Sequence, residues 1–405
     1  MLFTLEALQA KHGDCLLLHY GDPDDPKLIV IDGGPAGVYR RSLAPRLEEL
    51  RGDAETLRAR MLMVSHIDDD HIHGVLDLFD QIREDDEHPA RTVRYDFETL
   101  WHNSFDDLVG DGSDDLLDQA TEAVGGAAAL TGEVTPTVPV GHQATLVLAG
   151  VRQGRALRLQ AEALGLVLNQ VEDDEGGLLV ARDGSPAIDL GDGLTFRLLG
   201  PLESRVRALR DTWDRYLENE GLAQQPDVEV AAFLDRSVAN LASLMVLAEA
   251  GCKRMLLTGD GRGDDLLEAL EAADPPLLDD DGKLHVDLFK LPHHGSHHNV
   301  APELFERVTA DHYVFSGDGK HHNPEIDTFR MLLDARGPDA EPYTLHLTYA
   351  VDDLKVSRRE AFPTDELQGL LDEYRDAGHR FEVASPGLPD DGTSAVPSLR
   401  IPLLD

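Results

Sequence analysis

The chain has 405 residues, 41% of them hydrophobic, and carries 77 acidic side chains against 36 Lys and Arg, for a formal net charge of −41. This length exceeds one average domain, and the hydrophobic fraction is ordinary for a globular protein and argues against wholesale disorder. A field of that sign repels long polyanions, so a DNA duplex is an unfavourable partner. Either the acidic surface is merely solvated, or the substrate is short or follows a local basic strip. The candidates for such a strip are Arg152, Arg155 and Arg158, whose spacing of three places them near one helix face.

Targeting signals and cysteine usage bear on the compartment. No run of about 18 apolar residues is present, so no membrane helix is expected. The opening sequence MLFTLEALQAKHGDC lacks a basic start followed by a continuous apolar run, so no signal peptide is expected. Cys15 and Cys252 each lie in or beside a strand-like stretch, which fits a reducing compartment without a disulfide framework. We therefore expect a cytoplasmic protein without a membrane partner.

The first 83 residues have the pattern of an α/β layer. Short apolar runs rich in β-formers stop at turn residues or polar clusters, and one segment has leucines at helical spacing. The predicted strands are Leu16–Tyr20, Leu28–Ile31 and Met61–Val64, and the predicted helix is Arg41–Arg51. Functional residues are expected at the strand ends.

The rest of the chain divides into three parts. Residues 84–183 are predicted to be a largely helical insertion, residues 184–335 return to strand character, and residues 336–405 are a C-terminal extension. Helices are predicted over Ser113–Leu130, Val151–Leu168 and Glu203–Glu220. Strands are predicted over Leu194–Leu199, Ser243–Leu247, Arg254–Leu257 and Val286–Lys290.

The run SHIDDDHIHG, residues 65–74, is the strongest chemical signal. It follows an apolar strand directly and alternates imidazoles with carboxylates, which allows several ligands to meet at one point. The predicted ligands are His66, Asp68, Asp70 and His71, whereas Asp69 and His73 are expected to point elsewhere. Imidazole with carboxylate suits Zn, Mn or Fe, and the absence of thiolates here argues against a structural cysteine-type zinc site.

Two more histidine clusters occur, LPHHGSHH at residues 291–298 and KHHNP at residues 320–324. With the first run they hold nine of the 18 histidines, which favours a metal or catalytic role for them.

Two aspartates also follow predicted strands. Asp260 ends one of them, where a carboxylate can bridge two metal ions. Asp32 also follows a strand, but its Asp-Gly-Gly segment is equally well explained as an ordinary turn.

In this order the motifs resemble the metallo-β-lactamase superfamily. The branch typified by the ComEC hydrolase domain has SHxDxDH, an Asn-x-x-Ser segment, TGD and HHGS. Here these are residues 65–71, Asn240 to Ser243, Thr258 to Asp260 and His293 to Ser296. Residues 12–15, His-Gly-Asp-Cys, are similar to that family's opening Gln-Gly-Asp. The likeness covers roughly residues 1–83 and 184–335.

The resemblance implies a four-layer αββα sandwich that holds one or two divalent ions, Zn or Mn. It implies the ligands His66, Asp68, Asp70, His71, Asp260 and one of His293 and His294. This chain departs from the wider family by placing Asp68 at a histidine position and Asn240 near another, which shifts the metal preference toward Mn or Mg. The final histidine loop becomes His321-His322-Asn323-Pro324, and the membrane channel that accompanies the ComEC domain is missing, so DNA uptake is not expected.

The expected chemistry is hydrolysis by a metal-activated water, with Asp70 orienting it and moving protons. His294 is a further catalytic candidate, and His321 or His322 is expected to protonate the leaving oxygen or hold a phosphate oxygen. The favoured activity is a phosphodiesterase or nuclease that acts on small or single-stranded substrates. The alternatives are a hydrolase of a thioester, lactone or amide, and a partner-binding protein with a structural metal site, whose insertion or C-terminal extension contacts a protein.

Overall fold

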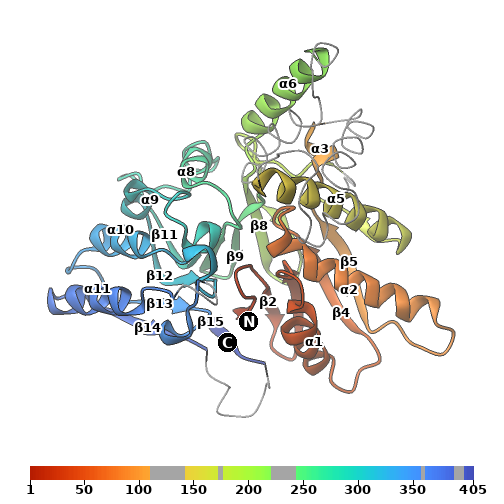
Figure 1. Ribbon diagram of the computed structural model, residues 1–405, viewed down its shortest axis with the longest axis horizontal. Helices are drawn as coiled ribbons and strands as arrows, with labels where there is room; N and C mark the ends of the chain where they lie inside the picture. The colour runs from red at the N-terminus through yellow and green to blue at the C-terminus, as the bar shows by residue number, and fades with distance from the viewer. Residues whose placement is uncertain (110–141, 172–176, 220–242, 357–360, 387–395) are drawn as a thin grey trace.

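The structure is a computed structural model that describes residues 1–109, 142–171, 177–219, 243–356, 361–386 and 396–405. Its strands form two mixed sheets (Figure 1). The first sheet has the order β15-β1-β2-β3-β4-β5-β6, antiparallel from β15 to β3 and parallel from β3 to β6. Its strands are β1 (Leu2–Leu8), β2 (Leu16–Asp22), β3 (Asp25–Ile31), β4 (Leu57–Met63), β5 (Tyr95–Trp101), β6 (Val167–Leu168) and β15 (Ser398–Leu404).

The second sheet has the order β14-β13-β12-β11-β10-β9-β8-β7. It is parallel from β14 to β10 and antiparallel from β10 to β7. Its strands are β7 (Ile188–Asp189), β8 (Leu194–Gly200), β9 (Met245–Ala250), β10 (Lys253–Leu257), β11 (Leu284–Lys290), β12 (Val308–Phe315), β13 (Tyr343–Leu347) and β14 (Phe381–Ala384).

The sheets pack against each other through one face and against helices through the other. Trp101 of β5 meets Phe196 of β8 edge to face, with ring centroids 6.0 Å apart. On β2, Leu18 belongs to the core shared by the sheets, and Leu17 belongs to the core under the helices. This double burial explains why the strands read as continuous apolar runs rather than as alternating patterns.

The helices lie on the outer sides of the two sheets (Figure 1). The first sheet packs against α1 (Ala44–Arg51), α2 (Asp69–Glu87) and α5 (His142–Ala163). The second packs against α8 (Gly263–Glu271), α9 (Pro302–Arg307), α10 (Ile326–Arg336) and α11 (Thr364–Asp376). A π-helical turn, Tyr39–Leu43, precedes α1, and α3 (Phe105–Val109) lies beside α6 (Glu203–Asn219). None of the described helices is both long and apolar enough to span a bilayer.

Most predicted strands and the helix over 203–220 are confirmed within a few residues, but residues 84–183 differ from the expectation. The boundary at 84 falls inside α2, and β5 and β6 extend the first sheet beyond β4. The helix predicted over Val151–Leu168 runs instead over His142–Ala163. It ends earlier than predicted because Gly165, at φ +71°, follows it and the chain then forms β6. The helix predicted over Ser113–Leu130 lies outside the described residues.

Residues 336–405, expected to be an extension, are part of both sheets. They supply β13 and β14 at one edge of the second sheet, and β15 pairs with β1 in the first sheet. The proposed arginine strip on α5 is partly neutralised, because Arg158 forms ion pairs with Asp107 and Glu162.

Candidate metal centre

The predicted ligands lie beyond the ends of strands, in the loops and short helical turns that follow them and in the first turn of α2. His66 follows β4, Asp260 follows β10, and both His293 and His294 follow β11. The carboxyl ends of parallel strands meet at the same edge, which is where α/β proteins bind ligands. Residues far apart in the sequence therefore meet because strand direction brings their loops together.

Asp260 is the centre of the cluster and is only 2% exposed. Its Oδ1 lies 3.2 Å from His71 Nε2 and 3.6 Å from His294 Nε2. Its Oδ2 lies 3.7 Å from His66 Nε2 and 3.6 Å from His293 Nε2. Each carboxylate oxygen thus faces its own pair of imidazole nitrogens.

The outer nitrogen of each ring of the buried pair has a hydrogen-bond partner, a carboxylate for His71 and a hydroxyl for His294. His71 Nδ1 lies 2.9 Å from Asp32 Oδ2. His294 Nδ1 lies 3.0 Å from Ser316 Oγ and 3.4 Å from Asp14 Oδ1. Where Nδ1 donates its proton, from His71 to Asp32 and from His294 to the Ser316 hydroxyl, Nε2 of the neutral ring keeps its lone pair and is free to ligate.

The other two rings have the same orientation. His293 Nδ1 donates to Asn299 Oδ1 at 2.8 Å. His66 Nδ1 lies 3.1 Å from Ser65 Oγ, which itself donates to Asp32 Oδ2 at 2.7 Å and so accepts from the ring. All four rings therefore present Nε2 to the same carboxylate.

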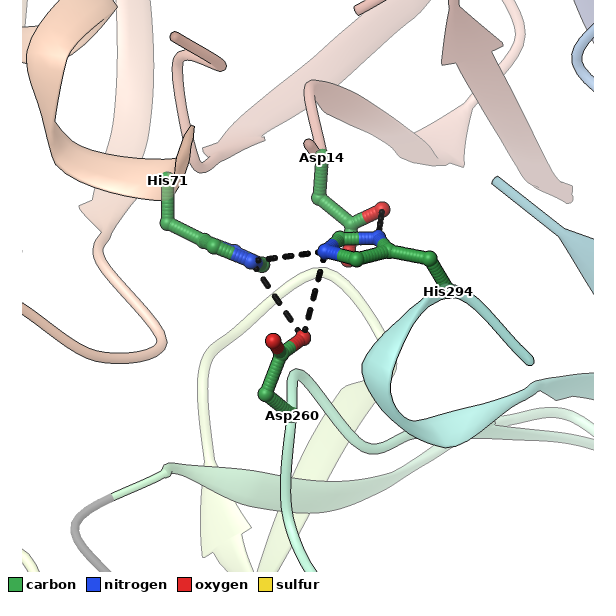
Figure 2. A group of neighbouring side chains, drawn as sticks. All are labelled: Asp14, His71, Asp260 and His294. Carbon is green, nitrogen blue, oxygen red and sulfur yellow. Dashed lines mark hydrogen bonds and ion pairs between the residues drawn. The ribbon is translucent and has the colours of Figure 1, made fainter. Parts of the chain in front are cut away.

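The buried side chains at the centre could hold a cation. Nε2 of His71 and Nε2 of His294 lie 3.3 Å apart, and Figure 2 shows the two rings pointing at each other above Asp260, with Asp14 behind the ring of His294. Two lone pairs at that distance repel unless a cation or a proton lies between them. Two further atoms of the centre, His66 Nε2 and Asp260 Oδ1, are buried and have no hydrogen-bond partner among the described residues, so they are available to a cation. The imidazole and carboxylate donors fit Zn or Mn.

The pKa shifts in this cluster are consistent with a site that takes up positive charge. Burial alone lowers the pKa of His71 and of His294, but Asp260 and other carboxylates outweigh it, raising the first well above its usual range and the second to about 9. Burial raises the pKa of Asp260, yet the surrounding imidazoles hold it well below its usual range. Without a metal, protons supply the positive charge that this carboxylate requires.

Two more predicted ligands border the centre. Asp70 Oδ2 lies 3.5 Å from His294 Nε2, and its Oδ1 lies 4.0 Å from His71 Nε2. Asp68 Oδ2 lies 3.6 Å from His66 Nε2. Their side chains are 24% and 29% exposed, so they mark the side of the centre that faces solvent.

Asp69 and His73 lie outside the cluster, as the sequence predicted. Asp69 Oδ1 lies 2.9 Å from His73 Nδ1 and accepts a hydrogen bond from Gln153 of α5 at 2.8 Å.

His321 and His322 are exposed in the turn Lys320–His322. The His321 ring packs edge-on against that of His12 at 5.6 Å, which places it on the rim of the site rather than among the ligands.

Sequence reasoning did not include two buried residues of this site. Lys290 Nζ lies 2.6 Å from Asp14 Oδ2, and both side chains are only 1% exposed. The pair fixes the carboxylate that faces His294. The resemblance of residues 12–15 to a Gln-Gly-Asp opening was the available signal for Asp14, whereas Lys290 looked like the end of an apolar strand.

The backbone of the site is strained at two predicted ligands and at Asp32, the residue behind His71. Asp32, His293 and His294 have φ values of 58°, 47° and 56°, in the left-handed region that non-glycine residues rarely adopt. Each such residue costs about 1–3 kcal/mol and persists where surrounding contacts hold it, commonly at functional sites.

Cys15 neighbours the centre but is a poor ligand. Burial raises the pKa of its thiol well above the usual range, and the negative charges of Asp32 and Asp14 add to this effect. The thiolate that a soft metal would need is therefore disfavoured, and the oxygen and nitrogen donors define the site.

Comparison with known proteins adds no assignment. No family model matches the chain, and no curated protein matches it. Among solved structures, the chain is similar to the crystal structure of a protein of unknown function from Enterococcus faecalis V583. The identity is 11%, the match covers 95% of this chain and 88% of that one, and the TM-score is 0.28, a value too low to support an argument.

We predict that Asp32→Asn weakens metal binding by about 10- to 100-fold, because the carboxylate behind a ligating imidazole sets its orientation and tautomer. Asparagine tolerates the positive φ, so the effect reports on charge rather than on the backbone. Asp192 is a matched control, since it has φ 52° and is exposed. Competition with a chelating dye gives both affinities, and equal values for Asp32→Asn and Asp192→Asn contradict the assignment.

Proposed function

We propose that the chain is a metal-dependent hydrolase that cleaves phosphodiesters, with the four-layer αββα architecture of the metallo-β-lactamase superfamily. The observation that carries the proposal is the carboxylate of Asp260, each of whose oxygens faces a separate pair of imidazoles. This arrangement suits two ions that share one bridging carboxylate, as in binuclear phosphodiesterases.

The residues divide into two sets around that bridge. His71, His294 and Asp70 surround the Oδ1 side. His66 and His293 face Oδ2, and Asp68 lies beside His66. Two imidazoles with two carboxylate groups for each ion are compatible with Zn and Mn. Divalent ions held there would lower the pKa of water toward neutrality and neutralise charge on the phosphoryl oxygens.

The protein groups have distinct roles in this proposal. Asp70 is partly exposed beside two ligating imidazoles, so it orients the attacking water and accepts its proton. His321, on the rim, donates a proton to the leaving oxygen or a hydrogen bond to a phosphate oxygen. His322 is exposed and shares that role as the alternative donor in the same turn.

The test is an assay of metal-free protein reconstituted with Mn, Zn or Mg, using a chromogenic phosphodiester and labelled single-stranded DNA. We expect metal-dependent cleavage, and we expect Asp70→Asn to reduce kcat by about 10²- to 10⁴-fold, the usual contribution of general acid–base catalysis. Asp69→Asn is the matched control, because that neighbour bonds to His73 and Gln153 instead. Near-normal turnover by Asp70→Asn would contradict the role of Asp70 in orienting the attacking water and accepting its proton.

The same assay separates the alternatives. A folded protein that binds metal but cleaves no phosphodiester is to be tested on thioesters, lactones and amides, the other bonds that this chemistry hydrolyses. If metal removal lowers the melting temperature and no ester of any kind is turned over, the centre is structural and the protein acts through partners.

A further inference from the structure

A group of basic side chains lies beside the proposed metal centre of this strongly acidic chain. Lys11 comes from the segment between β1 and β2, Arg41 from the π-helical turn Tyr39–Leu43, and Lys320 from the turn Lys320–His322. Within the described part of the chain, none of the three forms an ion pair. Many other basic side chains of the protein do pair with carboxylates, as Arg46 does with Glu6.

The loop of Lys11 is fastened directly to the centre. A Cβ on Gly13 would lie 1.8 Å from the main-chain oxygen of Asp70, so only glycine allows this contact. The next residue, Asp14, faces His294. Lys11 is held by its main-chain N–H, which donates to the Tyr349 hydroxyl at 2.8 Å, and its Nζ donates to Ala36 O. The loop therefore carries its cation to a fixed place beside the centre.

The other two cations are attached to the same region. Ser42 Oγ donates to Gln9 O at 2.9 Å, which holds the turn containing Arg41 beside the loop of Lys11. A Cβ on Gly317 would lie 3.6 Å from His294 Cβ, so the loop that leads to Lys320 packs on a ligand loop. Lys320 itself reaches back across, with Nζ 3.1 Å from His12 Nε2.

This last contact leaves a donor without an acceptor. An ammonium group only donates, so His12 Nε2 accepts and, in the neutral ring, Nδ1 carries the proton. That Nδ1 has no hydrogen-bond partner among the described residues. The other two cations act on Lys11. Burial lowers the pKa of Lys11, and the positive charges of Arg41 and Lys320 lower that pKa further. The carboxylates of Asp318 and Asp69 raise it, but only in part offset this effect. Lys11 is thus repelled by the two cations more than it is attracted by these two carboxylates.

We infer that Lys11, Arg41 and Lys320 form an anion-binding rim for a second phosphate of the substrate, one nucleoside away from the phosphodiester held at the centre. The inference rests on the proposed function and narrows its substrate to short nucleotide chains. A mononucleotide diester without a 5′-phosphate has no second phosphate to place on the rim. A long duplex would bring many further phosphates against a chain of net charge −41.

The first test compares two substrates of the metal-loaded enzyme, thymidine 3′-(4-nitrophenyl phosphate) and the same compound with a 5′-phosphate. We expect the 5′-phosphate to raise kcat/KM roughly tenfold, the effect of a charge-assisted hydrogen bond. In Lys320→Ala and Arg41→Ala this ratio should fall toward one. Lys283→Ala is the control, because the exposed Lys283 precedes β11, about 20 Å along the strand from the ligand loop that follows it.

A second measurement does not depend on catalysis. Fluorescence anisotropy in EDTA gives the affinity for labelled, 5′-phosphorylated dithymidylate, and we expect Lys320→Ala and Arg41→Ala to weaken it by roughly tenfold and to flatten its salt dependence. Competition with linear and cyclic dithymidylate shows which of the two backbones carries the second phosphate. No turnover by the wild type together with this loss of affinity rejects the proposed activity but keeps the rim. If all variants bind dithymidylate equally well and show the same ratio of kcat/KM with and without the 5′-phosphate, the proposed anion-binding rim is wrong.

Discussion

Asp260→Asn is expected to weaken metal binding by more than about 100-fold and to lower kcat/KM by about 10³-fold or more. The carboxylate faces four imidazoles, so both proposed ions lose a ligand at once, whereas loss of a residue behind a ligand typically costs 10- to 100-fold. A metal ion contributes several kcal/mol of transition-state stabilisation, which corresponds to this change in rate.

Metal content after dialysis, measured by atomic emission, and kcat/KM on the chromogenic phosphodiester report the two effects separately. Asp264→Asn is the matched control, because this nearby side chain is 57% exposed and pairs with Arg262. A variant at position 260 that keeps its full metal content contradicts the bridging role. A variant that loses its metal but keeps its activity contradicts the hydrolytic mechanism.

Glu6→Gln is expected to lower the free energy of unfolding by about 3–5 kcal/mol, the usual cost of breaking a buried ion pair. Glu6 is 1% exposed, and its Oε1 accepts from Arg46 Nε at 2.8 Å and from Ser398 Oγ at 2.8 Å. Its Oε2 lies 3.0 Å from His19 Nε2. The carboxylate therefore joins β1 to β2, α1 and β15, and its loss leaves Arg46 buried without its main partner.

The same substitution changes the pH dependence of stability. Burial raises the pKa of Glu6, but His19 and Arg46 outweigh it and lower the pKa from 4.5 to about 2. Because the folded pKa lies below the unfolded one, the carboxylate contributes about 3 kcal/mol of stability above pH 4.5, and this is lost as the pH falls through about 2. The difference between wild type and variant should thus be constant near neutral pH and shrink in acid.

Urea denaturation from pH 7 down to pH 3 measures this difference. Glu49→Gln is the matched control, because Glu49 pairs with the same Arg46 but is 27% exposed, so its substitution should cost less than about 1 kcal/mol. Equal costs for the two variants, or a difference that does not change in acid, would show that the Glu6 network adds no buried electrostatic stability.

Several features of the site could be predicted because they depend on local sequence. Apolar runs such as Leu28–Ile31 form strands, and the polar clusters that follow them necessarily lie at strand ends. His66, Asp70 and His71 are close in sequence and directly follow β4, so their proximity needs no long-range contact.

Other features depend on contacts between distant segments. His71 and His294 are 223 positions apart, and only the packing of the two sheets brings their Nε2 atoms to 3.3 Å. The division of ligands between the two oxygens of Asp260 follows from the same packing. The Asp14–Lys290 pair and β6 were not predicted, because a buried lysine and a two-residue strand have no local pattern that distinguishes them.

The sequence by itself determined the α/β character, most strands and the chemical types of the candidate ligands, because side-chain periodicity and turn residues act over a few neighbours. Only the tertiary structure decided which nitrogen of each histidine faces Asp260, which side chain holds the ring there, and that three cations gather beside the centre. These depend on strand order and loop packing, where free energy comes from contacts between residues far apart in the chain.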